Sequence, residues 1–346
     1  MGRYDCVVLH NSVALTEAID SQEPIFPSSI IRDEVGAVEE SLRDGGFNPY
    51  VLAVDYFSRD IVNTLARIGP KFVFNLCEEI NRRCELEMCV AGLLELMGIP
   101  YTGSGPLALG LALNKFRVKQ LLRSLKIPTA RGYVHLPGQK PKSRRVRFPV
   151  IVKPVSEDGS LGIRSSSVCH DPVRLDEQVA LIHETYRQGA LVEEYLDGRE
   201  FNVSIMGDEQ PSILAVSEID FSGMPEDLPK IVCYRAKWDE ESPMYRGTVP
   251  ICPADLPRRH EEMVRDVALR SFQALGCRDY GRVDMRSDAL GNLYVLEVNP
   301  NPDIGPEAGF VRAARTAGYS YAEMVLRISE MALARGERVA ATAYAL

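Results

Sequence analysis

Short apolar runs alternate with helix-like repeats along the first hundred residues of the chain. Three runs are typical of buried strands, at residues 4–9, 49–54 and 71–76. Apolar side chains recur at the helical period from 31 to 42, and a second such repeat ends before Gly98. Because strands and helices alternate in this way, residues 1–101 are predicted to form a small α/β domain with a Rossmann-like parallel sheet.

The rest of the chain also mixes apolar strands with amphipathic helices. Asp171 and Pro172 form a typical helix start, and Gly189 is predicted to end that helix. Other helices are predicted at 115–125, 260–275 and 320–335, and an apolar strand at 148–154. We therefore predict two further α+β units, over residues 102–190 and 191–346.

Polar side chains follow a strand-like period near the end of the chain. Apolar and polar residues alternate in 281–285 and 295–302, so Asp284, Glu297 and Asn299 should point to one face of two adjacent strands. Three oxygen ligands would then converge, as Mg²⁺ prefers when it also binds nucleotide phosphates. The alternative is a polar strand end at which Asn299 begins a turn.

A lysine at a strand end beside a glycine-bearing loop indicates a phosphate site. Lys153 ends the apolar strand, and the loop that follows contains Gly159, Ser160 and Gly162. Backbone N–H groups of such a loop can form an anion nest, while the ammonium adds a point charge.

Residues 190–204 read as two strands around a tight turn at Asp197 and Gly198. In this arrangement the backbone of 194–196 could face an adenine edge. Glu200 could then accept hydrogen bonds from ribose hydroxyls.

In their order and spacing, these segments resemble an ATP-grasp ligase of the D-alanine–D-alanine ligase-like branch. The resemblance covers nearly the whole chain and includes Glu-Glu-Tyr-Leu at 193–196, Gly-Arg-Val-Asp at 281–284 and Glu-Val-Asn-Pro at 297–300. It implies the ATP-grasp fold: an N-terminal Rossmann-like domain and two α+β subdomains that clamp ATP, with the lid at 102–190 and the metal site in 191–346. ATP and one or two Mg²⁺ ions, or Mn²⁺ in their place, are the implied cofactors.

The same resemblance implies roles for single residues. The ATP phosphates would be held by Lys115, Lys153 and the loop that carries Ser160. Adenosine would be held by Glu193, Glu194, Leu196 and Glu200. The metal would be held by Asp284, Glu297 and Asn299.

Two cationic residues are implied to act on the reacting groups. Arg282 would stabilise a tetrahedral oxyanion, because its charge and its planar fork are fixed. The alternative for Arg282 is an ion pair with Asp284 or Glu297. Lys237 matches a phosphate-contacting lysine on a mobile loop, and an exposed loop lysine is the alternative.

The substrate half departs from the D-alanine–D-alanine ligase pattern. Residues 10–17 lack that branch's glycines and serine–glutamate run, and 75–81 replace its His-Gly-containing loop. Ser160 stands where the branch has two serines, Trp238 replaces a tyrosine, and Asp303 stands where a glycine helps to hold the second substrate. These changes predict a different acid or amine.

Position in the fold suggests which residues bind the substrate that replaces D-alanine. Ligands of open α/β sheets bind beyond the carboxyl ends of strands, which favours Glu78, Glu79 and Glu17. A carboxylate there could receive the ammonium of an amino-acid substrate; a surface acidic pair or a helix cap is the alternative. Trp238 and Asp303 complete the predicted substrate set.

Composition limits the kinds of partner that the protein is expected to bind. The 346 residues include 40 basic and 48 acidic ones, and the net charge of −8 argues against nucleic acid and anionic membranes. A cytoplasmic location is expected because neither a signal segment nor a run of about 18 apolar residues occurs. A homodimer is compatible with the sequence. Cys-x-x-Cys pairs are missing from the eight cysteines, so reduced, mostly buried thiols are predicted, Cys77 and Cys89 among them.

The leading interpretation is a Mg-ATP-dependent ligase that joins a small acid to an amine through an acyl phosphate, giving a dipeptide or amide other than D-alanyl-D-alanine. A small-molecule phosphotransferase with the same nucleotide site is the main alternative. A catalytically silent nucleotide-binding module is the third, and the presence of Lys115, Lys153 and Arg282 argues against it.

Overall fold

The computed structural model describes residues 4–12, 28–139 and 146–343. Its first part is the predicted parallel sheet, whose strands run in the order β2-β1-β3. The strands are β1 (Cys6–His10), β2 (Pro49–Ala53) and β3 (Phe72–Leu76). The helices of this part are α1 (Ser28–Asp44), α2 (Arg59–Ile68) and α3 (Glu87–Leu96), with a short 3₁₀ turn η1 (Cys84–Leu86) before the last.

The second part is a small antiparallel sheet in the order β4-β7-β5-β6, covered by α6. Its elements are β4 (Gly132–His135), β5 (Val150–Pro154), η3 (Ser165–Ser167), β6 (Val168–Cys169), α6 (Pro172–Tyr186) and β7 (Ala190–Glu194). The predicted start of α6 is confirmed, because the Asp171 carboxylate accepts from the N–H groups of Val173 and Arg174.

The predicted end of α6 at Gly189 is wrong. The helix ends at Tyr186, because Arg187 adopts the left-handed conformation at φ 52°. Gly189 instead allows close packing, since a Cβ there would lie 2.7 Å from the Val134 side chain of the neighbouring strand.

The third part is a five-stranded antiparallel sheet in the order β10-β9-β8-β11-β12. Its strands are β8 (Glu200–Gly207), β9 (Ser212–Asp220), β10 (Val249–Ile251), β11 (Asp279–Ser287) and β12 (Leu293–Asn299). One face packs on α4 (Pro106–Leu113), α5 (Lys115–Ser124) and α9 (Arg258–Ala274). The other packs on α10 (Gly309–Thr316) and α11 (Tyr321–Ala343), and the short helices α7 (Tyr234–Trp238) and α8 (Pro243–Arg246) lie between β9 and β10 in sequence.

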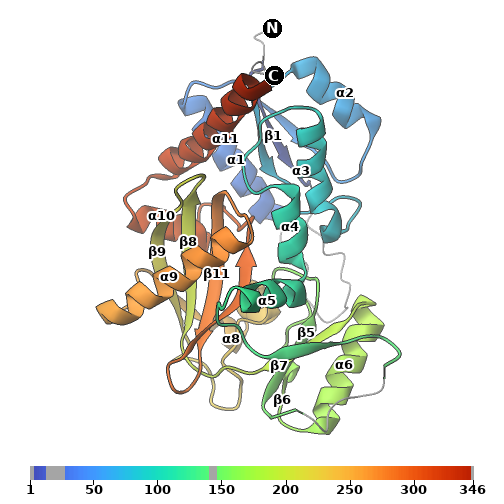
Figure 1. The fold of residues 1–346 in the computed structure, drawn as a ribbon, viewed down its shortest axis with the longest axis vertical. Coiled ribbons are helices and arrows are strands. Elements are labelled where there is room, and N and C mark those ends of the chain that lie inside the picture. Colours follow the sequence, from blue (N-terminus) through green and yellow to red (C-terminus); the bar gives the residue numbers. More distant parts are fainter. Residues whose placement is uncertain (1–3, 13–27, 140–145, 344–346) are drawn as a thin grey trace.

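The core of the first part continues into the last helices. Val38 of α1 and Phe74 of β3 belong to one buried cluster with Val325 and Ile328 of α11. Figure 1 shows α11, the red helix, beside α1 and β1 of the blue N-terminal part. The division of the chain at 101 and 190 stays a prediction, and this cluster joins residues from both sides of it.

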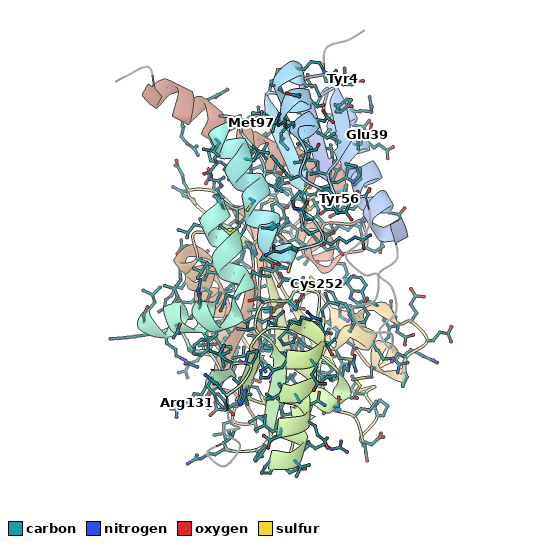
Figure 2. The ribbon with its side chains drawn as sticks, turned by 90° about the vertical axis from the view of Figure 1, so that its right-hand side faces the viewer. Tyr4, Glu39, Tyr56, Met97, Arg131 and Cys252 are labelled. Atoms are coloured by element: carbon teal, nitrogen blue, oxygen red, sulfur yellow. The ribbon has the colours of Figure 1, made fainter. Side chains whose placement is uncertain are left out.

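The three parts form an elongated molecule. Figure 2 shows Tyr4 and Met97 at the end built by the N-terminal sheet and Arg131 toward the other end. Within the described ranges no helix is long and apolar enough to cross a membrane.

All eight cysteines are free thiols, and five of them are buried. The expectation for Cys77 is met, but the expectation for Cys89 is wrong because its side chain is exposed. Helix α3 turns Val90, Ala91 and Leu94 inward instead, and an apolar run does not reveal which of its faces is buried.

Candidate active site

Four polar side chains share one face where β11 and β12 pair. Asp284 lies directly opposite Glu297, and Arg282 lies opposite Asn299. The predicted convergence on two adjacent strands is therefore confirmed, since opposite residues on one face of an antiparallel pair have Cβ atoms about 4.5–5.5 Å apart.

Arg282 makes the ion pair that the sequence left open. Its Nε and Nη2 donate to the two carboxylate oxygens of Asp284, at 2.7 Å each. The side-chain amide of Asn202 donates to the same carboxylate at 2.7 Å. Arg282 also lines the cavity described below, so the pair fixes its position without removing it from the site.

Three buried side chains form an ion-pair cluster that includes Lys153, one of the cations that lower the pKa of Glu297. Lys153 Nζ lies 2.5 Å from Glu193 Oε1, and Lys119 Nζ lies 2.6 Å from Glu193 Oε2. Burial raises the pKa of Glu193, but the two ammonium groups outweigh it and leave the pKa below its ordinary value. Glu193, predicted to hold adenosine, thus also anchors Lys153.

Lys119 was missing from the predicted site. It lies four residues after Lys115, so the helical period alone places both on one face of α5.

Glu297 is surrounded by cations. Burial raises its pKa, but Lys115, Lys153 and Arg282 together lower it to about 2. Lys115 Nζ lies 3.3 Å from Glu297 Oε2 and 3.4 Å from Asp158 Oδ1. The pKa of Lys115 is lowered by burial, yet these carboxylates raise it more, so both partners stay charged.

The donors suit Mg²⁺ bound together with a nucleotide. Among the described residues no group of three or more His, Cys, Asp or Glu gathers as a metal cluster. Asp284 and Glu297 supply two carboxylates and Asn299 an amide oxygen, which leaves positions for phosphate and water oxygens.

The turn between β7 and β8 follows residues 194–196, whose backbone was predicted to face the nucleotide base. Gly198 is required there, because a Cβ would lie 2.6 Å from the Ser287 carbonyl oxygen. Glu194 Oε2 accepts from the Arg131 N–H at 3.3 Å, and Leu196 is buried. Burial raises the pKa of Glu200 to about 7 despite its hydrogen bond from Arg286 at 3.1 Å.

The glycine-bearing loop after β5 is held by α7 and the segment before it. Ser160, at φ 65°, donates its hydroxyl to the Val232 carbonyl at 2.9 Å. Trp238 Nε1 donates to the Gly159 carbonyl at 3.3 Å. Lys237 lines the cavity beside Trp238, with Nζ 4.9 Å from the indole centroid, and is not an exposed loop lysine. Burial, with Arg282 second, lowers its pKa.

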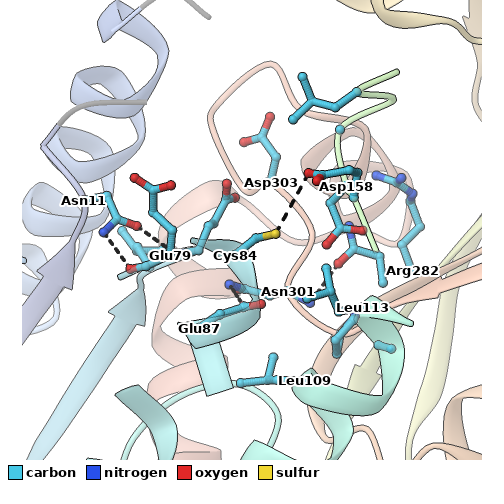
Figure 3. Close-up of a pocket in the computed structure, with 18 of the residues that line it drawn as sticks. Asn11, Glu79, Cys84, Glu87, Leu109, Leu113, Asp158, Arg282, Asn301 and Asp303 are labelled. Atoms are coloured by element: carbon cyan, nitrogen blue, oxygen red, sulfur yellow. Dashed lines mark hydrogen bonds between the residues drawn. The ribbon is translucent and has the colours of Figure 1, made fainter. Parts of the chain in front are cut away.

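A cavity of about 170 Å³ opens beside Arg282. Figure 3 shows Asn11 and Glu79 on one side of it and Arg282 and Asp158 on the other. Its lining includes these predicted residues: Glu78, Glu79, Lys237, Trp238, Arg282, Asn299 and Asp303. Glu17 lies outside the described residues.

Two asparagines that the sequence did not single out shape this cavity. Asn11 Oδ1 accepts from the N–H groups of Glu78 and Glu79 at 2.8 and 3.2 Å, which fixes the turn after β3. Asn301 Nδ2 donates to Glu87 Oε1 at 2.9 Å and to the Cys77 carbonyl at 3.3 Å. Asn11 follows a parallel strand directly, so the rule that nominated Glu78 also applied to it.

Comparison with known proteins identifies the family. The model described as D-ala D-ala ligase C-terminus matches residues 134–330. An uncharacterised protein of Sinorhizobium fredii is 34% identical over 89% of this chain and 88% of its own length. A D-alanine–D-alanine ligase of Cereibacter sphaeroides is 34% identical over 82% of this chain and 84% of its own. The chain belongs to the D-alanine–D-alanine ligase family.

Solved structures give the same fold. The crystal structure of the Bacillus anthracis D-alanine–D-alanine ligase complexed with ATP superposes with a TM-score of 0.75 at 21% identity, covering 97% of this chain and 99% of that one. The Coxiella burnetii enzyme gives 0.75 at 15% identity, covering 99% and 98%. The predicted ATP-grasp fold is confirmed. The predicted class, an ATP-dependent carbon–nitrogen ligase that forms ADP, is confirmed by membership of the D-alanine–D-alanine ligase family.

Proposed function

We propose that this member of the D-alanine–D-alanine ligase family joins a small carboxylic acid to an amine other than D-alanine, with Mg-ATP as the energy source. The acid oxygen attacks the γ-phosphorus, ADP leaves, and an acyl phosphate forms. The amine nitrogen then attacks the acyl carbon, inorganic phosphate leaves, and the nitrogen loses a proton.

The observation that carries this proposal is the charge arrangement at the cavity's edge. Lys115 contacts Glu297 and also Asp158, and Asp158 lines the cavity next to Lys237. Lys153 is held within the same buried group by Glu193. Fixed ammonium groups beside an ionised carboxylate suit phosphoryl transfer, in which catalysis is mostly positioning and neutralisation of charge.

Different residues would bind the nucleotide, the metal and the oxyanion. Lys115 and Lys153 would hold ATP phosphates, and Glu200 would accept from the ribose. Asp284, Glu297 and Asn299 would hold Mg²⁺, which supplies charge neutralisation on the phosphate oxygens. Arg282, fixed by Asp284, would face the oxyanion that forms when the amine attacks.

Product analysis with acid and amine pools tests the ligase. ADP and free phosphate should appear only when both an acid and an amine are present, and mass spectrometry should find the condensed product. A phosphorylated small molecule that accumulates without amine would favour the phosphotransferase instead.

The altered substrate residues support a substrate other than D-alanine. Trp238 offers only an N–H donor, and that donor is given to the Gly159 carbonyl. Asp303 adds a carboxylate to the cavity. We expect D-alanine to be a poor substrate in both positions, because unmatched polar groups can discriminate by several orders of magnitude. Efficient formation of D-alanyl-D-alanine would overturn this part alone.

A further inference from the structure

Among the described residues, the lining of the cavity holds more acidic than basic side chains. Seven of these lining residues are Asp or Glu, whereas Lys237 and Arg282 are its Lys and Arg members. Arg282 is already paired with Asp284. The described wall therefore offers more carboxyl groups than cationic partners before a substrate enters.

Several of these carboxyl groups have a partner in the protein. Asp158 pairs with Lys115, Glu157 accepts from Gln188, and Glu87 accepts from Asn301. Two others accept backbone N–H groups: Glu34 from Ile304, and Asp303 from Gly305. Glu78 and Glu79, on the turn after β3, line the cavity and make no ion pair and no side-chain hydrogen bond among the described residues.

Glu79 gives a second, independent observation. The residue is 3% exposed, and its Oε2, although buried, finds no hydrogen-bond partner in the described part of the chain. The turn that carries it is fixed by Asn11, so the carboxylate does not have to be ordered when a ligand arrives. Leaving a buried carboxylate oxygen unpaired costs free energy that a ligand cation would recover.

On the basis of the ligase function proposed above, we propose that Glu78 and Glu79 form a subsite for a second ammonium group, so that one substrate carries two ammonium groups; we call it a dication whether or not it also carries a carboxylate. An amino acid with an uncharged side chain brings one ammonium group and leaves this subsite empty. A diamine, or an amino acid with a cationic side chain, brings two. These two sources share the chemistry that the subsite recognises.

The position of the subsite fits a substrate that spans the cavity. Glu79 and Asn11 lie on the side opposite Arg282, beside which the acyl group would react (Figure 3). One nitrogen can then lie near the reacting carbon while the other binds the carboxylates. A cavity of about 170 Å³ suits a small molecule.

Matched pairs of ligands test the subsite directly. The full-length protein, saturated with Mg²⁺ and a nonhydrolysable ATP analogue, is titrated calorimetrically with 1,4-diaminobutane against butylamine, and with lysine against norleucine. In at least one pair the dication should bind about tenfold tighter or more, because removing one partner of a buried charged contact has large effects. The pair that discriminates identifies the source.

Charge-neutral variants complete the test. Glu79→Gln and Glu78→Gln should each remove most of the discrimination while leaving binding of the analogue unchanged. Glu85→Gln is the matched control, because Glu85 belongs to the same segment but is exposed and paired with Arg83. If Glu79→Gln does not fold, Glu78→Gln decides, since the Glu78 side chain is open to the cavity. Equal binding within both pairs, or discrimination that survives Glu78→Gln, would overturn the subsite.

A ligation assay separates this inference from the function on which it rests. Dication binding without condensation with any acid would leave the subsite standing and remove the ligase proposal. Turnover with butylamine or norleucine, which carry one ammonium group, as efficient as with 1,4-diaminobutane or lysine would leave the ligase and remove the subsite.

Discussion

Glu297 is the residue at which the lysines and the predicted metal ligands meet. Its carboxylate contacts Lys115 and lies opposite Asp284 on the neighbouring strand. Changing Glu297 to Gln keeps the shape and removes the charge. We expect most turnover to be lost at low Mg²⁺ while the fold is retained.

Steady-state rates over a Mg²⁺ titration, with circular dichroism as the fold check, measure this. Glu262→Gln is the control, because Glu262 is exposed on α9 and pairs only with Arg258 among the described residues. Near-normal turnover of the Glu297 variant at low Mg²⁺ would remove the metal assignment.

Glu78 and Glu79 titrate near neutrality. Burial and Asp303 raise the pKa of Glu78 to about 7, and burial and Asp55 raise the pKa of Glu79 to about 7. The other charged or titratable groups near these two, among the described residues, include Lys237, Asp158, Arg82, Glu34, Glu87, Cys77 and His10.

The sign of the pH effect follows from these directions. Below pH 7 the two carboxyls are mostly protonated and offer no charge, whereas above it they are ionised. Amine ligands stay protonated throughout, with pKa values of about 10. Dication affinity should therefore rise from pH 6 to pH 8, and the rise should shrink in Glu78→Gln. Calorimetry at both pH values checks it, and an affinity that falls over this interval would contradict it.

The residue roles were only partly readable from the sequence. Period-two alternation placed Asp284 and Glu297 together, because strand geometry fixes which side chains share a face. It left open whether Arg282 pairs with Asp284, and it did not foresee that Glu193 binds two lysines. The Glu193 contacts depend on how α5 and the strands of the small sheet pack, which no local pattern encodes.

At the scale of elements, the glycine-bearing loop and the segment with α7 are hydrogen-bonded to each other. Ser160 is bonded to Val232, and Tyr234 N–H donates to the Ile163 carbonyl at 3.1 Å. Both segments contribute lining residues to the cavity that contains Lys237. We expect residues 156–162 and 222–248 to exchange amide hydrogens quickly without nucleotide and slowly once a nonhydrolysable analogue binds.

Hydrogen exchange followed by mass spectrometry measures this closure, and α9 serves as an internal reference because its inner face is buried in the sheet core. Unchanged protection of both loops on saturation with the analogue would contradict it.

Element positions were predicted best where a periodic pattern was bounded by a clear signal. Strand β3 and helix α5 lie within a residue or two of their predicted bounds. The end of α6 was missed, because Arg187 adopts a left-handed conformation that glycine usually takes. The length of α11 was underestimated, since its last turns continue past Arg335 without a stop signal.

At the scale of the molecule, one buried ion pair joins distant segments. Arg335 of α11 donates to both oxygens of Asp279, at 2.8 and 2.7 Å, and to the Tyr101 carbonyl at 2.7 Å. Asp279 is fully buried and also accepts from the Gly103 N–H at 2.8 Å. Asp279→Asn should lower stability by about 3 kcal/mol, because Arg335 then keeps only the more distant Asp208 carboxylate, at 3.3 Å, as a counter-charge among the described residues.

Chemical denaturation of the ligand-free protein measures this loss. Arg338→Gln is the matched control on the same helix: Arg338 pairs with Asp208 but is half exposed, so a change within about 0.5 kcal/mol is expected. Equal stability of Asp279→Asn and the wild type would show that the Arg335–Asp279 ion pair does not hold the segments together.

The apolar core shared by β3, α1 and α11 also fixes a length. Glu79 follows β3, and Arg282 lies on β11, whose Tyr280 belongs to that same core. The gap between the proposed subsite and Arg282 is thus set by packing and not by the nucleotide. Such a gap acts as a ruler: along the series from diaminopropane to diaminohexane, affinity should peak at one chain length and fall on either side of it. A flat profile would mean that the walls adjust to the ligand.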